Sequence, residues 1–187
     1  GIRGGAYAEY QEEGVLFPFR ISDNIEISPG LYSFFGVRTR FNTPENRKIS
    51  MGIDFDAGQF YDGTRKGTEI EANFNLSSSF RMETAYEFNA LRFPERSGEN
   101  SLNIHSVNVK ALYMLSTRLS ASALVQYVST EDELITNFRI RYNPREGNDF
   151  YIVYNDFRGV NRLNSVPALP SFFGRTVMVK YTHTFIL

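Results

Sequence analysis

The chain closes with the stretch RTVMVKYTHTFIL, residues 175–187, in which apolar and polar side chains alternate. Successive side chains of a β-strand point to opposite faces, so one face of this stretch is apolar and the other carries threonine and lysine. The apolar face consists of Val177, Val179, Tyr181, Phe185 and Leu187. The stretch therefore predicts an amphipathic strand, and the rest of the chain decides whether its apolar face meets lipid or a protein core.

The composition narrows the class of protein. The 187 residues are 42% hydrophobic and 22% charged, and they contain no run of eighteen apolar residues that would span a bilayer as a helix. A β-barrel would hide its membrane character, because only every second residue of a strand touches lipid. The 17 Phe and 11 Tyr suit rings at membrane interfaces. A net charge of −1 argues against nucleic-acid binding, and the absence of cysteine excludes disulfide and thiolate chemistry.

Alternation with period 2 recurs along the chain and predicts about nine strands after Gly30. Most of them are long enough for a tilted strand to cross a bilayer, which takes about 9–11 residues, whereas soluble strands usually have about five or six. They cover residues 32–41, 49–59, 68–76, 80–91, 106–115, 119–128, 133–142, 150–155 and 175–187.

The connections alternate in length, as in single-chain barrels with short periplasmic turns and longer outer loops. With a periplasmic C-terminus, residues 60–67, 92–101, 129–132 and 156–174 lie outside, and only residues 42–48 are longer than their inner position predicts. The longest loop, 156–174, carries apolar side chains at Leu163, Val166, Leu169, Phe172 and Phe173. We expect it to fold over the mouth or contact a partner, with a poorly ordered outer loop as the alternative.

Residues 1–31 depart from this pattern, because Pro18 and Pro29 interrupt the periodicity. They predict an irregular segment with a short strand near residues 6–10 or a plug, followed by the antiparallel strands of residues 32–187. Bacterial single-chain barrels usually have an even number of strands. We therefore expect a tenth strand near residues 6–10, or further strands before Gly1.

Several stretches resemble one family of bacterial two-part outer-membrane proteins. NFRIRYNP (137–144) and GNDFYIVYN (147–155) resemble its closing hairpin, and GQFYDG (58–63), NALRFP (89–94), RLSASALVQY (118–127), PFRI (18–21) and SPGLY (28–32) are similar to it elsewhere. In that family a module similar to family 9 carbohydrate-binding modules precedes a barrel half of unknown function. The resemblance implies that this chain is the C-terminal part of the barrel half, and that any glycan binding belongs to a module absent from it.

Projecting the polar faces inward predicts a lumen in which acids and bases are segregated. The charged candidates are Arg38, Arg40, Asp54, Asp56, Glu69, Glu71, Arg81, Glu83, Glu87, Lys110, Arg139, Arg141 and Lys180. Opposite charges on neighbouring strands can pair across the ladder, so one interpretation is a structural charge network. The other is a transverse field that orients a polar solute in a pore.

The sequence gives weaker evidence for catalysis or metal binding. Asp54, Asp56, Glu69 and Glu71 can be read as the paired carboxylates of a glycoside hydrolase, although any polar barrel face places carboxylates at alternating positions. Two histidines are too few for a zinc site, and no catalytic or nucleotide-binding motif occurs. We expect no catalytic residue, metal or cofactor in this chain.

These observations predict an all-β, antiparallel up-and-down transmembrane β-barrel, or the C-terminal portion of one, in the outer membrane of a Gram-negative bacterium. It would serve as a membrane anchor and as a pore, with lipid and the barrel-assembly machinery as partners and a glycan or an envelope complex as a further one. The apolar face of residues 175–187 would be the assembly signal. A soluble lipocalin-like barrel that binds a hydrophobic ligand is the alternative, and a glycan hydrolase is the third reading.

Overall fold

The computed structural model describes residues 1–22, 24–96, 98, 100–160 and 173–184, and these form twelve β-strands. None of these residues forms a helix long and apolar enough to cross a membrane. The strands are β1 (Arg3–Val15), β2 (Phe19–Ser22), β3 (Ile25–Ile27), β4 (Gly30–Asn42), β5 (Ile49–Phe60), β6 (Gly63–Asn75), β7 (Phe80–Arg92), β8 (Ser101–Met114), β9 (Leu119–Val128), β10 (Glu133–Arg145), β11 (Asn148–Gly159) and β12 (Gly174–His183).

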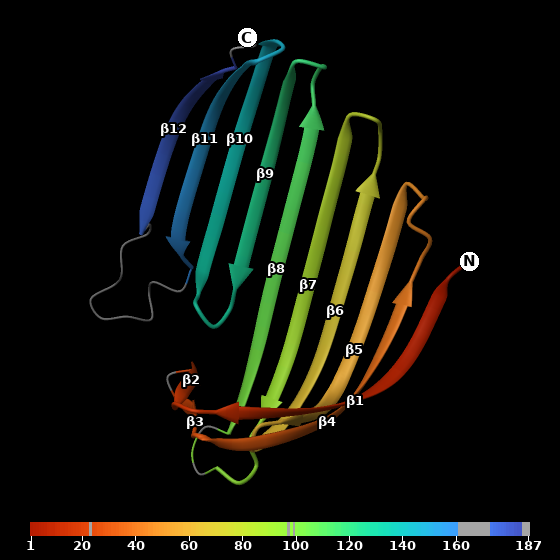
Figure 1. Cartoon of the computed structure of the whole chain (residues 1–187), viewed down its shortest axis with the longest axis vertical. Helices are drawn as coiled ribbons and strands as arrows, with labels where there is room; N and C mark the ends of the chain where they lie inside the picture. Colours follow the sequence, from red (N-terminus) through yellow and green to blue (C-terminus); the bar gives the residue numbers. More distant parts are fainter. Residues whose placement is uncertain (23, 97, 99, 161–172, 185–187) are drawn as a thin grey trace. The chain divides into compact units, whose positions relative to one another are not determined.

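Ten strands form one sheet in the order β1-β4-β5-β6-β7-β8-β9-β10-β11-β12, and β2 pairs with β3 in a separate hairpin (Figure 1). Consecutive strands of the large sheet are neighbours and pair antiparallel, as between β4 and β5 and between β10 and β11. The prediction of an all-β, antiparallel up-and-down fold is confirmed. The order ends at β1 and β12, so the hydrogen-bonded sheet is open in the described residues.

Each of the nine strands expected after Gly30 overlaps one of β4 to β12, and the differences lie at the ends. β6 begins at Gly63 instead of residue 68, because a glycine at this position lets the chain pass the carbonyl of Arg92 at a distance that a side chain would block. β11 continues to Gly159, so the outer loop expected at 156–174 begins later. Residues 161–172 of that loop lie outside the described residues, as do Phe185 and Leu187.

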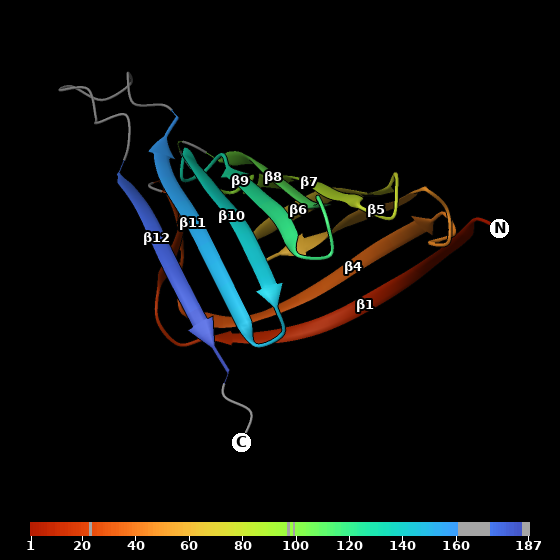
Figure 2. The ribbon, with the colours of Figure 1, turned by 90° about the horizontal axis from the view of Figure 1, so that it is seen from above.

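The N-terminal segment contains the tenth strand expected near residues 6–10, but this strand is much longer than expected and leaves less of the segment irregular. β1 has 13 residues and pairs with β4 along its whole length, from Arg3 opposite Asn42 to Val15 opposite Gly30. Figure 2 shows the two strands side by side. Small residues such as Gly5 and Ala6 conceal the alternation, and Pro18 lies after the strand rather than within it.

Contacts group the chain into two compact units. The first comprises Gly1–Glu45, Met51–Glu71 and Tyr86–His105, and the second Asn46–Ser50, Ala72–Ala85 and Ser106–Leu187. The second unit contains the ladders from β9 to β12, with a register shift between Tyr142 and Arg145 and a left-handed backbone at Gly147 in the turn that follows.

The first unit has an apolar cluster built around the β2–β3 hairpin. Ile25 and Ile27 of β3 and Phe93 are fully buried, and Val15 and Leu91 complete the buried set. Partly buried side chains that pack against it include Tyr32 of β4, Phe60 of β5 and Leu102 of β8. Val15 has the same parity along β1 as Glu9 and Glu13, and Tyr32 and Phe60 have the same parity as the charged residues of β4 and β5. The hairpin therefore covers one end of the polar face.

This cluster provides a test of the fold. Truncating fully buried Phe93 to Ala should lower the free energy of unfolding by roughly 3–5 kcal/mol, because it leaves a cavity among Ile25, Ile27 and Leu91. The measurement is urea-induced unfolding of the protein refolded in detergent. Phe17→Ala is the matched control, since this ring is 80% exposed and its loss should change the free energy by less than about 0.5 kcal/mol. Equal effects of the two variants would contradict the assigned packing.

Candidate functional site

The polar face of the first unit is organised by an ion pair between β4 and β5. The register places Arg40 opposite Asp54 and Arg38 opposite Asp56. Arg40 donates from Nε to Asp54 Oδ1 at 2.7 Å, and its Nη2 lies 2.5 Å from Oδ2. Arg38 Nη2 lies 3.5 Å from Asp54 and 3.7 Å from Glu69 of β6. Asp54 is only 7% exposed, so two arginines compensate a buried carboxylate.

A second group continues this network across β6 and β7. Arg65 Nε lies 3.4 Å from Asp56 Oδ2 and donates to Asn89 Oδ1 at 2.9 Å. Asn89 in turn donates to Glu87 Oε1 at 2.8 Å. Gly67 makes this arrangement possible, because a Cβ there would collide with the carboxylate of Asp56.

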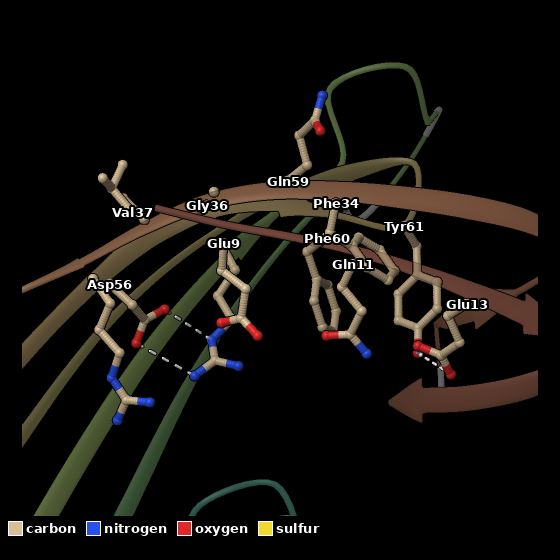
Figure 3. A pocket seen from close by; sticks show the side chains of 14 residues that line it. Glu9, Gln11, Glu13, Phe34, Gly36, Val37, Asp56, Gln59, Phe60 and Tyr61 are labelled. Carbon is tan, nitrogen blue, oxygen red and sulfur yellow. Dashed lines mark hydrogen bonds and ion pairs between the residues drawn. The ribbon is translucent and has the colours of Figure 1, made fainter. Parts of the chain in front are cut away.

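A cavity of about 270 Å³ opens on the same face of the first unit. Figure 3 shows Glu9, Gln11, Asp56 and Phe60 pointing to one side of the sheet, whereas Val37 and Gln59 point to the other. The lining residues are Glu9, Gln11, Glu13, Phe34, Gly36, Val37, Arg38, Asp56, Ala57, Gly58, Gln59, Phe60, Tyr61 and Arg65. The cavity therefore adjoins charged groups on one side and aromatic rings on the other.

Two glycines form part of the floor of this cavity. Gly36 and Gly58 are directly opposite each other in the β4–β5 ladder. A Cβ on Gly58 would lie 2.7 Å from the Cα of Gly36 and 2.7 Å from the carbonyl oxygen of Phe35, so that position accepts no side chain without a shift of the backbone. The paired glycines bring the strands close together and leave the space above them open.

Tyr61 forms the aromatic side of the cavity. Its ring makes edge-on contacts with Phe19, Tyr32, Phe34 and Phe60 at centroid distances of 5.5, 5.1, 5.3 and 4.8 Å. The backbone of Tyr61 has a φ of 51°, a left-handed conformation that is uncommon for a residue with a side chain. Its hydroxyl donates to Glu13 at 3.3 Å, and burial, followed by the charge of Glu13, raises the pKa of the Tyr61 hydroxyl.

Arg96 fastens the β2–β3 hairpin to the adjacent turn. Its guanidinium makes two hydrogen bonds of 2.6 Å to the Asp62 carboxylate, donates at 2.8 Å to the carbonyl oxygen of Glu26 in β3, and lies 4.5 Å from the centre of the Phe93 ring. The hydrogen bonds from Arg96 lower the pKa of the Asp62 carboxyl. The contact with Arg96 therefore favours the ionised form of Asp62.

The remaining charged candidates are distributed over both units. In the second unit Glu83 lies 2.9 Å from Arg81 and 3.7 Å from Lys110, and Arg141 lies 2.7 Å from Asp149. Within the described residues no ion pair is made by Arg139, Lys180, Glu71 or Glu87, although Glu87 joins the first network through its hydrogen bond from Asn89. The predicted lumen set thus divides into paired networks and three charges outside them, and its role in binding stays a prediction.

The predicted assembly face is exposed over the part that the structure describes. Val177, Val179 and Tyr181 are 66%, 61% and 62% exposed. They stand opposite Tyr154, Ile152 and Phe150 of β11, so the apolar face continues onto the neighbouring strand. Its recognition by assembly machinery stays a prediction.

Several site residues were not among the sequence candidates. Glu9, Gln11 and Glu13 occupy alternate positions on one face of β1. They were not candidates because most of this segment was expected to be irregular. Arg65 and Tyr61 lay in an expected loop, and the packing of Arg96 on Phe93 depends on a tertiary contact. The described residues hold no group of three or more histidine or carboxylate side chains placed to bind a metal.

The ion pair of Arg40 with Asp54 yields a testable prediction. Arg40→Ala should lower the free energy of unfolding by roughly 1–3 kcal/mol, because a nearly buried carboxylate loses its closest donor. Urea-induced unfolding in detergent measures the change. Arg47→Ala serves as the control, since Arg47 is exposed and makes no ion pair within the described residues. A change equal to that of the control would show that the pair contributes nothing.

No protein-family model matches the chain, and no curated protein matches it. These comparisons give no support to a parent with a module similar to family 9 carbohydrate-binding modules. Among solved structures, a NanC porin in a rhombohedral crystal form is similar at 12% sequence identity with a TM-score of 0.44, and the alignment covers 98% of this chain and 99% of that chain. Likeness at this level assigns no family and no activity.

Proposed function

We propose that this chain forms wall strands of a β-barrel in the outer membrane of a Gram-negative bacterium. It anchors the protein in the membrane, and its polar face lines an aqueous passage. The observation that carries the proposal is the inverted distribution of side chains. Asp54 is 7% exposed within a charge network, whereas Phe35 and Val37, on the other face of β4, are 55% and 50% exposed. A soluble protein rarely leaves a continuous apolar face open to water.

The second unit supports the same proposal through its cross-strand rows. Phe138, Tyr154 and Val177 stand side by side on β10, β11 and β12, and two further rows follow. These are Ile140, Ile152 and Val179, then Tyr142, Phe150 and Tyr181. The last row is entirely aromatic and lies next to the β10–β11 turn, as in the aromatic girdles at membrane interfaces.

Charges flank this apolar face at its other end. Asp156, on the same face of β11, forms ion pairs with Arg158 and Arg175. Charged side chains at the end of an apolar band suit the headgroup region, where water and lipid phosphates are available. The apolar rows between Asp156 and the β10–β11 turn would then lie at hydrocarbon depth.

The hairpin gives the passage a constriction in this proposal. β2–β3 packs on the polar face at the end of β1, β5 and β7, where Val15, Phe60 and Leu91 contact it. A segment between two wall strands that folds against the polar face would narrow the lumen at that mouth. Arg96 would hold it there through Asp62 and the Glu26 carbonyl.

The other readings fit less well. A lipocalin-like barrel would place its apolar faces inward around a ligand, but here the polar face carries the cavity and the buried Asp54. For a glycan hydrolase, Asp54 and Asp56 are each engaged by an arginine. A glycan or envelope partner would bind through a part of the protein other than these strands.

Two adjacent residues of β12 test the membrane placement. Val179→Arg should destabilise the protein in a bilayer by about 2–4 kcal/mol, because it puts a charge on the lipid face, whereas Met178→Arg points to the polar face and should be tolerated. Both residues are more than half exposed, at 61% and 51%. Folding into lipid vesicles, followed by urea titration, measures the difference. Tolerance of both variants, or release of the native protein by carbonate without detergent, would reject the proposal.

The passage is tested by electrical recording. Arg96→Ala should raise the mean single-channel conductance of the full-length protein in planar bilayers and increase its fluctuations, because the hairpin loses its two anchors. Arg20→Ala is the control, since its ion pair with Glu26 is highly exposed and leaves Asp62 bound. Absence of conductance in the native protein would contradict the proposed passage but not the proposed anchoring role. A native-like conductance in Arg96→Ala would contradict the proposal that the hairpin constricts the passage.

A further inference from the structure

We infer that the cavity above Gly36 and Gly58 binds a small organic cation that combines an ammonium group with a compact apolar body. The inference deepens the proposed function and rests on it for the solute's route of access. It comes from three features of the cavity. These are an uncompensated negative charge, an aromatic wall beside it, and a floor kept free of side chains.

The charge balance of the lining favours a cation. The cavity has three carboxylates, Glu9, Glu13 and Asp56, and two guanidinium groups, Arg38 and Arg65. Arg65 is engaged by Asp56, and Arg38 by Asp54 and Glu69. Glu13 accepts a hydrogen bond from neutral Tyr61, and Glu9 makes no hydrogen bond or ion pair within the described residues. Two negative charges therefore lack a cationic partner at this cavity.

The aromatic wall supplies the second element of recognition. Phe34, Phe60 and Tyr61 line the cavity, and their edge-on contacts hold the rings at large angles to one another. Figure 3 shows Phe60 and Tyr61 on the same side of the sheet as Glu9 and Gln11. Aromatic rings beside a carboxylate are the usual surroundings of bound ammonium groups, because the negative ring faces attract a cation.

The floor and the volume limit the size of the ligand. Neither Gly36 nor Gly58 fills the space above the ladder, and the volume of about 270 Å³ lies just below the roughly 300–1,000 Å³ of sites for drug-sized molecules. A compact ammonium compound fits this space. An anion would meet Glu9 and Glu13 while both guanidinium groups of the cavity are already paired with carboxylates, and a neutral polyol would leave the charges of Glu9 and Glu13 unpaired.

Two probes of the same shape distinguish recognition of the ligand's charge from mere occupation of the cavity volume. Choline and its uncharged isostere 3,3-dimethyl-1-butanol are titrated into the detergent-solubilised full-length protein, and heat or tyrosine fluorescence reports binding. Choline should bind and the alcohol should bind at least about fivefold more weakly. Equal binding of the two, absence of choline binding, or preference for glucose or acetate would overturn the inference.

The variants place the binding in this cavity. Glu9→Gln should weaken choline binding by about fivefold while keeping the shape of the side chain. The matched control is Glu12→Gln, because Glu12 lies on the opposite face of β1, where it accepts a hydrogen bond from Tyr10. Gly36→Leu should abolish binding by filling the floor, since a Cβ at Gly36 meets no atom closer than 3.6 Å and the fold can accept it. Equal effects of the Glu9 and Glu12 variants, or native binding by Gly36→Leu, would overturn the assignment.

These measurements are independent of the membrane tests. Binding in detergent requires the folded cavity but neither insertion nor conductance. If the native protein binds choline but is released by carbonate, the binding site is supported and the proposed membrane role is contradicted. If it resists carbonate but does not bind choline, the membrane role is supported and the binding site is contradicted.

Discussion

Alternation of side chains across a hydrogen-bonded ladder is the constraint on which this structure depends. Because the period is two, the register that sets Arg40 opposite Asp54 also sends Val37 and Phe41 to the other face of β4. The same rule aligns Ile140, Ile152 and Val179 across three strands of the second unit. A shift by one residue would turn these apolar side chains to the polar face and place arginine on the apolar one. Charge pairing and apolar contact therefore enforce the same register.

Glycine determines what the polar face can hold. Gly67 gives the Asp56 carboxylate its place next to Arg65, and the Gly36–Gly58 pair keeps the neighbouring space open. Glycine weakens a strand, because it loses more backbone entropy on folding and packs no side chain. In these strands, its positions coincide with a charge network and with a cavity. Glycine thus weakens the strands at the positions where the charge network and the cavity need space.

The sequence predicted the strands better than their surroundings. Alternation located nine strands, because long strands such as β4 and β12 repeat the pattern many times. For β1 it indicated only a short strand near residues 6–10, because glycine and alanine carry no apolar signal, whereas the strand runs from Arg3 to Val15. The charged candidates of β4 and β5 do meet, since neighbouring strands in an up-and-down sheet are adjacent in sequence. Leu91 and Leu102 belong to an apolar cluster that only the folded hairpin creates, so periodicity alone could not separate them from the polar lining. The sequence did not predict the cavity, because β1 supplies Glu9, Gln11 and Glu13 to it and most of this strand was expected to be irregular.

The apolar cluster explains how the polar face of the first unit can be charged along most of its length and tightly packed at one end. Along most of the polar face of the first unit, ion pairs satisfy the side chains, but at the hairpin end Ile25, Ile27 and Phe93 exclude water. Tyr61 stands at the boundary between these regions, with its ring against four others and its hydroxyl on Glu13. Its left-handed backbone costs about 1–2 kcal/mol, which the ring contacts offset. A turn held in this conformation places a large ring on the polar face of the sheet, beside Phe60 (Figure 3). Packing of the Tyr61 ring and the hydrogen bond of its hydroxyl to Glu13 therefore fix the boundary between the two regions.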